Sequence, residues 1–142
     1  MQIPIRPLPV RLLTCSLAAS GCAKLAAIST TIEFRPNHLI FRMHDGPAAM
    51  WLITRGKVFV SRSASGLFSE SFGRGIFGLT ETIAAIPYGE SLVADSYCSC
   101  ERVDRAALLE LLSDENGACS ALLSGLSRNY IRGVQQLASE LN

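Results

Sequence analysis

The sequence predicts an α+β protein that is mainly β: an antiparallel jelly roll (double-stranded β-helix) with one helix before it and two helices after it. Helical spacing up to about residue 28 gives way to short strand-favouring runs over residues 29–103, and helical spacing returns over residues 104–141. The strand-like runs recur at about 8–12-residue intervals, which is typical of a sandwich or jelly roll and not of alternating βαβ units. The length of 142 residues fits one domain.

Composition and charge exclude several classes of protein. Apolar residues make up 49% and charged residues 18%, so the chain can bury a packed core. Thirteen basic against twelve acidic residues give a net charge of +1, which argues against a surface built to hold nucleic acid. The longest uncharged stretch near the N-terminus, Leu12 to Ala23, is shorter than the roughly 20 residues that cross a bilayer. We therefore expect no membrane association and a cytoplasmic location.

The N-terminal region has two interpretations. We expect a proline-rich lead-in at residues 1–15, followed by an amphipathic helix from about Ser16 to Ile28 that opens the domain at residues 16–142. Alternatively, basic residues followed by a short apolar run that ends at Cys22 are similar to a bacterial lipoprotein signal. The second interpretation makes the chain a lipid-anchored envelope protein.

The predicted strands are separated by turn signals. They are Thr30–Phe34, Leu39–Phe41, Met50–Ile53, Lys57–Val60, Leu67–Phe72, Ser91–Ala94 and Tyr97–Val103. Arg35-Pro36-Asn37 is a turn signal between the first two strands. Thr54-Arg55-Gly56 predicts a tight hairpin between the third and fourth strands, with Gly56 at the strained position.

The C-terminal part predicts a short helix and a long one. Asp104 is a good N-cap for a helix over Arg105 to Leu112. A longer helix is predicted from about Ala118 to Leu141. Its apolar stripe is Leu123, Leu126, Tyr130, Val134, Leu137 and Leu141. Because a small jelly roll cannot cover a helix of that length, we expect the stripe to pack against the same helix of a second copy and form a homodimer.

This order of elements resembles the cyclic nucleotide-binding domain of CRP/FNR-type transcription regulators, over about Leu17 to Leu141. Phe34 to Asp45 follows the pattern aromatic-x-x-Gly-x-x-Ile-Phe-x-x-Gly-Asp, with Asn37 and His44 in place of the two glycines, and Trp51 to Val60 matches Tyr-x-Ile-x-x-Gly-x-Val-x-Val. Gly75-Ile76-Phe77-Gly78 matches the start of the family's phosphate-binding cassette, and Ser91 to Ala94 resembles the Thr-Val-x-Ala strand that follows it.

The resemblance implies a cyclic nucleotide, cAMP or cGMP, as the ligand, although no cofactor is certain. It places the binding positions at Gly78, Leu79, Thr80, Glu81, Tyr88, Gly89, Glu90 and Ser91, with Arg132 and Gly133 of the long helix near the pocket. The family has a Glu for the ribose hydroxyl where this chain has Leu79, and an Arg for the cyclic phosphate where it has Tyr88. A buried phosphodiester needs a fork of donors, whereas Glu90 adds negative charge and no basic residue lies between Arg74 and Arg102. We expect altered or lost nucleotide binding; Thr80, Tyr88 and Ser91 are the donors left for a different ligand.

The function that follows is a regulatory or sensor domain in signal transduction and transcription regulation, with a small-molecule effector. We expect no direct DNA binding by this chain alone, because it ends where the relatives' helix-turn-helix begins. A protein-interaction module with a collapsed pocket remains an alternative. The sequence shows no nucleophile elbow, P-loop or metal-hydrolase motif, so we expect no enzyme activity.

Three other patterns need an interpretation. Cys98 and Cys100 share one face of a predicted strand and fit buried free thiols, with a redox pair or a metal site as alternatives. Cys15 and Cys22 are too few for an N-terminal iron–sulfur cluster. Residues 73–78 read Gly-Arg-Gly-Ile-Phe-Gly, a dinucleotide fingerprint, but the helix that must follow is cut short by Pro87. His38 and His44 are expected to be turn or surface residues.

Overall fold

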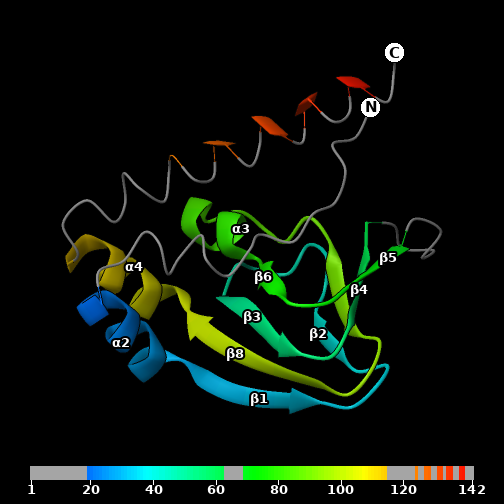
Figure 1. Cartoon of the computed structure of the whole chain (residues 1–142), viewed down its shortest axis with the longest axis horizontal. Coiled ribbons are helices and arrows are strands. Elements are labelled where there is room, and N and C mark those ends of the chain that lie inside the picture. Colours follow the sequence, from blue (N-terminus) through cyan, green and yellow to red (C-terminus); the bar gives the residue numbers. More distant parts are fainter. Residues whose placement is uncertain are drawn as a thin grey trace.

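The computed structural model describes residues 19–62 and 69–114, together with separate helical positions between 124 and 139. The elements are α2 (Ala19–Ile28), β1 (Thr30–Phe34), β2 (Leu39–Phe41), β3 (Ala49–Arg55), β4 (Val58–Ser61), β5 (Ser69–Phe72), β6 (Gly75–Phe77), α3 (Leu79–Ala84), β7 (Ser91–Ala94), β8 (Cys98–Asp104) and α4 (Arg105–Asp114). The predicted fold class, a mainly antiparallel β roll with flanking helices, is confirmed (Figure 1). The lead-in at residues 1–15 lies outside the described residues.

The strands form two four-stranded sheets. One has the order β1-β8-β3-β6 and the other β2-β7-β4-β5, and every strand pair is antiparallel. Consecutive strands therefore alternate between the sheets along much of the chain, as they do in a jelly roll. Figure 1 shows α2 and α4 side by side next to β1 and β8, and α3 contacts both β3 and α4.

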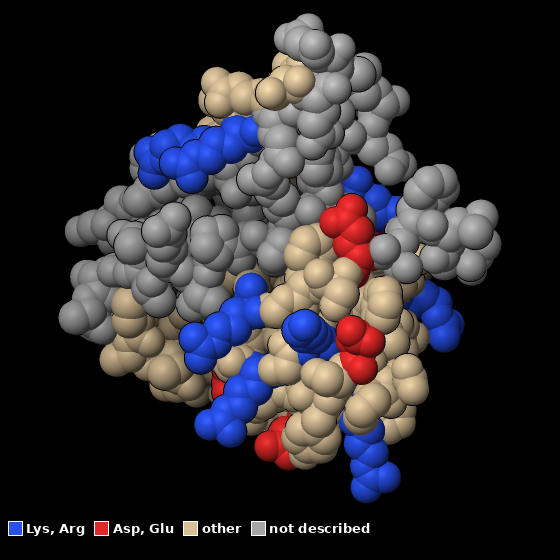
Figure 2. Space-filling model, turned by 45° about the vertical axis from the view of Figure 1, so that its right-hand side comes forward, with Lys and Arg blue, Asp and Glu red and all other residues tan. Residues whose placement is uncertain are grey.

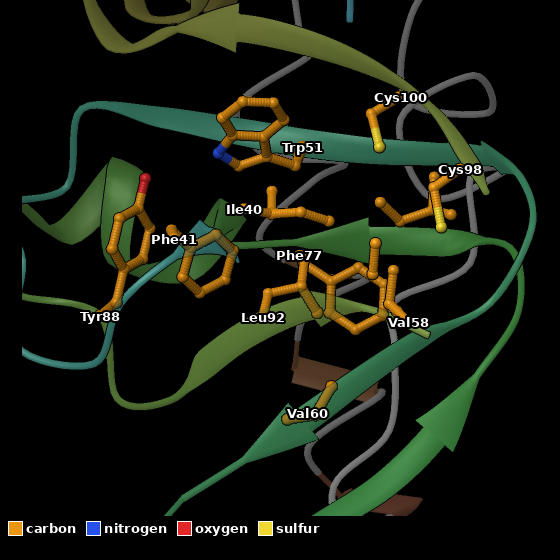
Figure 3. Close-up of a cluster of buried hydrophobic side chains, with 12 residues drawn as sticks. Ile40, Phe41, Trp51, Val58, Val60, Phe77, Tyr88, Leu92, Cys98 and Cys100 are labelled. Carbon is orange, nitrogen blue, oxygen red and sulfur yellow. The ribbon is translucent and has the colours of Figure 1, made fainter. Parts of the chain in front are cut away.

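Alternation along β3 divides the interior into two cores. Met50 and Leu52 face a core between the sheet and the helices, whereas Trp51 and Ile53 face a core inside the roll. We call the first the helix-side core: Leu25, Met50, Leu52, Ile76, Leu79, Val103, Leu108, Leu111 and Leu112. The second is the roll core: Ile40, Phe41, Trp51, Ile53, Val58, Val60, Phe77, Tyr88, Leu92, Ala94, Cys98 and Cys100 (Figure 3). Because both faces of β3 are buried, its sequence is a continuous apolar run.

Turn conformations explain two departures from the family pattern. Asn37 and His44 stand where the family has glycine, and both have a positive φ, 71° and 76°. These turns need the left-handed region, which Asn and His enter more readily than most residues with a side chain. Both turns therefore adopt a left-handed conformation although glycine is absent at these positions.

The predicted hairpin between β3 and β4 is wrong. Gly56 is strained as expected, with φ +88°, and a Cβ there would collide with the carbonyl oxygen of Tyr97. The turn does not, however, pair the two strands it joins, since β3 pairs with β6 and β8 while β4 pairs with β5 and β7. The segment is a corner that carries the chain from one sheet to the other.

The flanking helices are observed where the structure describes them. Cys22 lies inside α2 and packs against the helix-side core, which favours the domain helix over a lipoprotein signal. The helix after β8 begins at Arg105, as predicted, and the Asp104 carboxylate accepts a hydrogen bond from Arg102 Nε at 2.9 Å. No helix among the described residues is long and apolar enough to cross a membrane.

The long C-terminal helix is described only in part. Positions between 124 and 139 that are described are helical and exposed, including Arg132. Val134 of the predicted dimer stripe is 40% exposed, and Ile131 beside it is 52% exposed. Leu123, Leu126, Tyr130, Gly133, Leu137 and Leu141 lie outside the described residues. The homodimer therefore stays a prediction.

Candidate functional site

The cassette residues lie between β6 and β7, around the short helix α3. Gly78 precedes the helix with φ +77° and is buried. A Cβ at this position would lie 2.9 Å from Cε1 of Tyr88 and 3.3 Å from the carbonyl oxygen of Ala49, so a residue larger than glycine does not fit. Leu79 follows at 1% exposure and packs in the helix-side core, on the side away from the roll interior.

Tyr88 occupies the position at which the resemblance expects an arginine. Its side chain is 3% exposed, and its ring stacks on Phe41 with centroids 4.1 Å apart and planes 20° apart. The hydroxyl donates to the carbonyl oxygen of Ala49 at 2.5 Å and accepts from the Ala49 amide at 3.2 Å. Figure 3 shows the ring beside Phe41 with its oxygen directed to the start of β3. Tyr88 is therefore an integral part of the roll core.

The backbone of Tyr88 is held as firmly as its side chain. Its amide donates to the carbonyl oxygen of Asp45 at 3.0 Å, and its carbonyl oxygen accepts from the His44 amide at 2.9 Å. These two bonds fasten the end of the cassette to the turn in which His44 has its positive φ. Movement of Tyr88 would consequently disturb that turn and the start of β3 together.

Charged residues gather at the other end of the cassette. Arg62 Nε lies 3.7 Å from Glu90 Oε2, and both side chains are partly buried. Burial raises the pKa of the Glu90 carboxyl, the negative charge of Glu81 raises it further, and Arg62 lowers it. This end of the cassette thus brings together two carboxylates and one guanidinium.

The remaining predicted positions differ in their surroundings. Thr80 and Gly89 are exposed, and a Cβ added at Gly89 would meet open space. The Ser91 hydroxyl oxygen accepts a hydrogen bond from the Met43 amide at 2.8 Å. Arg132 is exposed on the C-terminal helix.

Arg105 links α3 to α4. Its Nε donates to the carbonyl oxygen of Thr82 at 2.9 Å, and its amide donates to the carbonyl oxygen of Ala48. Thr82 is fully buried, and its hydroxyl has no hydrogen-bond partner among the described residues. The cassette helix is therefore joined to α4 both by this bond and by the packing of Leu79.

The two thiols of β8 are packed in the roll core. Cys98 Sγ donates to the carbonyl oxygen of Lys57 at 3.0 Å, and burial raises the pKa of the Cys100 thiol to about 12. A thiol that keeps its proton is a poor nucleophile and a poor metal ligand. Both are free thiols, and the residues that the structure describes contain no cluster of His, Cys, Asp and Glu able to hold a metal ion. Cys15 and Cys119 lie outside those residues.

The dinucleotide-like motif and the histidines have ordinary structural roles. Gly75 to Phe77 form β6, which runs antiparallel to β3, whereas a dinucleotide fingerprint requires a parallel βαβ unit. His38 and His44 are exposed turn residues, as expected. On the face shown in Figure 2, acidic side chains lie among the basic ones, consistent with the net charge of +1.

Sequence reasoning missed the partners that give the cassette its shape. Phe41 and Ala49 hold Tyr88, and Arg62 holds Glu90. A search for a cation between Arg74 and Arg102 could not find Arg62, because strand pairing between β4 and β7 brings it to the cassette from 28 positions earlier in the chain than Glu90. Arg62 can be found as a partner of Glu90 from the pairing of β4 with β7 and not from the local spacing of residues.

Comparison with known proteins shows the family. The family model for the cyclic nucleotide-binding domain matches residues 31–115, which is more than half of the chain. The chain therefore belongs to the cyclic nucleotide-binding domain family. No curated protein matches the sequence.

Solved structures show the same fold in regulators. A cyclic nucleotide-binding protein from Ruegeria pomeroyi aligns with a TM-score of 0.71 and 19% identity, over 90% of this chain and 58% of that one. The catabolite activator protein of Thermus thermophilus gives 0.70 and 19%, over 92% and 61%. The sensor domain of the transcriptional regulator DNR from Pseudomonas aeruginosa gives 0.70 and 22%, over 83% and 86%. This chain thus spans about three fifths of the first two proteins and most of the isolated sensor domain.

Two cassette positions carry side chains other than those of the family pattern. Leu79 has no polar group for a ribose hydroxyl and faces the helix-side core. Tyr88 carries no charge for a phosphate, and its hydroxyl is already bonded to Ala49. Thr80 and Gly89 are exposed and Ser91 is half-buried, and Thr80 and Ser91 offer uncharged hydroxyl groups.

Proposed function

We propose that this chain is a regulatory domain of the CRP/FNR type whose nucleotide site is closed by its own side chains. The observation that carries the proposal is Tyr88, which is buried and stacked on Phe41 at the position of the phosphate-binding arginine. The domain then regulates by contact with other proteins or with a second copy, and not by chemistry on a substrate. In this proposal the site no longer binds a cyclic nucleotide, cAMP or cGMP, in the way that is usual for the family.

The energetics of Tyr88 support closure. A nucleotide that used this position would have to displace the ring and leave the amide and carbonyl of Ala49 without their tyrosine partner. Each buried polar group left unpaired costs about 1–3 kcal/mol, and ring stacking is lost as well. Closure therefore competes directly with binding of a ligand.

Dimerisation through residues 118–141 completes the proposal. The exposure of Ile131 and Val134 supports a surface on this helix that a partner covers. Substitution of Leu126 and Leu137 by Arg should convert a dimer to a monomer in light scattering, whereas Leu39→Arg, at an exposed strand residue, should not. A wild-type protein that is monomeric at high concentration would contradict this part.

Thermal unfolding and calorimetry with cAMP and cGMP test the closed site. A ligand at 100 times its Kd would stabilise the fold by about 2.7 kcal/mol, a rise of several degrees in Tm for a domain of this size. We expect no rise with either nucleotide at millimolar concentration. The positive control is the second cyclic nucleotide-binding domain of PKAR with Sp-2Cl-cAMPS, a pair seen together in a structure that aligns with a TM-score of 0.67 and 16% identity. A dose-dependent rise with this chain would overturn the proposal.

A further inference from the structure

Arg62 and Glu90 meet at the rim of the roll interior. β4 and β7 are antiparallel neighbours, and Ser61 opposite Ser91 is their last registered pair. Arg62 and Glu90 come one residue beyond that pair, two residues from Val60 and Leu92, which are fully buried. Both residues lie directly beyond the ends of the paired strands, and both side chains are partly buried.

Two carboxylates and one guanidinium interact where this pair lies. Arg62 is 28% exposed and Glu90 17% exposed, with Nε and Oε2 3.7 Å apart. Glu81 on α3 is the second carboxylate that acts on Glu90. A partly buried carboxylate near a second one is unfavourable unless a cation compensates, and Arg62, directly after β4, supplies that cation.

The position of the pair coincides with the altered part of the cassette. Glu90 is two residues after Tyr88, where the family pattern has its phosphate-binding arginine. A guanidinium offers a planar fork of donors that suits an oxyanion whether it comes from a carboxylate or a phosphate. The guanidinium of Arg62 therefore offers the same donors as the arginine that the family pattern has at position 88. In this structure the Glu90 carboxylate pairs with it.

We propose that the Arg62–Glu90 ion pair is an autoinhibitory contact, in which the Glu90 carboxylate takes the place of the anionic group of a ligand on Arg62. This inference rests on the proposed function, since it explains how a site closed at Tyr88 keeps a cation near the cassette. The ligand class that Arg62 would recognise after release is a small molecule that carries a phosphate group. Removal of the Glu90 charge should uncover such a site.

The test is a gain of binding in Glu90→Gln, which keeps the side-chain size and removes the charge. We would measure binding of cAMP, cGMP and inorganic phosphate by calorimetry, and use the fluorescence of Trp51, the single tryptophan, as a second readout. We expect at least one probe to bind about tenfold or more tightly than to the wild type, and Arg62→Gln in the same protein to abolish the gain. Glu70→Gln, at an exposed position on β5, is the matched control and should gain nothing.

The outcomes separate this inference from the proposed function. Equal affinity of Glu90→Gln and wild type for all three probes, or a gain that survives Arg62→Gln, overturns the autoinhibitory contact. Binding of cAMP to the wild type overturns the proposed function, whereas the ratio between variant and wild type still decides the inference. If Glu90→Gln does not give a cooperative thermal transition, Glu90→Ala serves as the second variant with the same expectation.

Discussion

Two pairs of residues around the cassette differ in what holds them: Leu79 and Tyr88 are held by apolar packing, whereas Arg62 and Glu90 are held by opposite charges. The first two are almost fully buried, one in each core, and Tyr88 adds hydrogen bonds to Ala49. The ion pair is partly exposed and includes a carboxylate whose pKa is raised by burial. Apolar packing is part of the folding free energy and resists changes in pH, whereas the ion pair depends on protonation and salt.

Truncation of Leu79 should have the largest effect on stability. Leu79→Ala removes a side chain from the helix-side core and should lower the free energy of unfolding by about 2–5 kcal/mol in urea denaturation. Thr80→Ala, at the exposed next residue, should change it by less than about 0.5 kcal/mol. Similar values for the two variants would show that Leu79 faces solvent or a ligand cavity and not a packed core.

Removal of the Tyr88 hydroxyl should have an intermediate effect. Tyr88→Phe keeps the stack on Phe41 but leaves the Ala49 groups without the hydroxyl, at a cost of about 1–3 kcal/mol in the free energy of unfolding. Tyr97→Phe is the matched control, because that tyrosine is exposed and bonds Glu33 at the surface. If both changes cost the same small amount, the Tyr88 hydroxyl is not held in the core.

The ionisation of Glu90 should give the smallest effect. Its pKa is raised above 4.5, so at pH values just above 4.5 the native state holds a proton that the unfolded chain has released. The free energy of unfolding should therefore fall as pH rises through the raised pKa. The difference between wild type and Glu90→Gln, measured by urea denaturation from about pH 4 to 7, isolates this contribution. A difference that is constant or grows in favour of the wild type with pH would contradict the assignment.

Much of the fold was predictable because local sequence patterns determine its strands, helices and turns. The strand pattern from Thr30 to Asp104, the helix after β8 and the turns at Asn37 and His44 follow from periodicity and from residues that tolerate a positive φ. The short strand β6 was missed because three residues that begin with glycine carry no clear alternation. The corner at Gly56 was read as a hairpin because a turn signal does not say which sheet the next strand joins.

In the candidate site, the sequence predicted only which positions differ from the family pattern. Leu79 and Tyr88 stand out against the pattern, and their burial follows from their apolar or aromatic character. Their partners required the three-dimensional structure, because Phe41, Ala49 and Arg62 come from parts of the chain distant in sequence. Pairing between strands far apart in the chain is not encoded in any short window.

The most direct test of the proposed closure by Tyr88 is an NMR titration of the wild-type chain with cAMP. Backbone amides report local binding even when it is too weak for calorimetry, and those of Gly78, Thr80 and Gly89 border the cassette. We predict that these amides keep their chemical shifts at millimolar cAMP, within the changes seen for residues of α2. Saturable shifts at Gly78 and Gly89, with the rest of the spectrum unchanged, would show that the cassette accepts the nucleotide and would contradict the account.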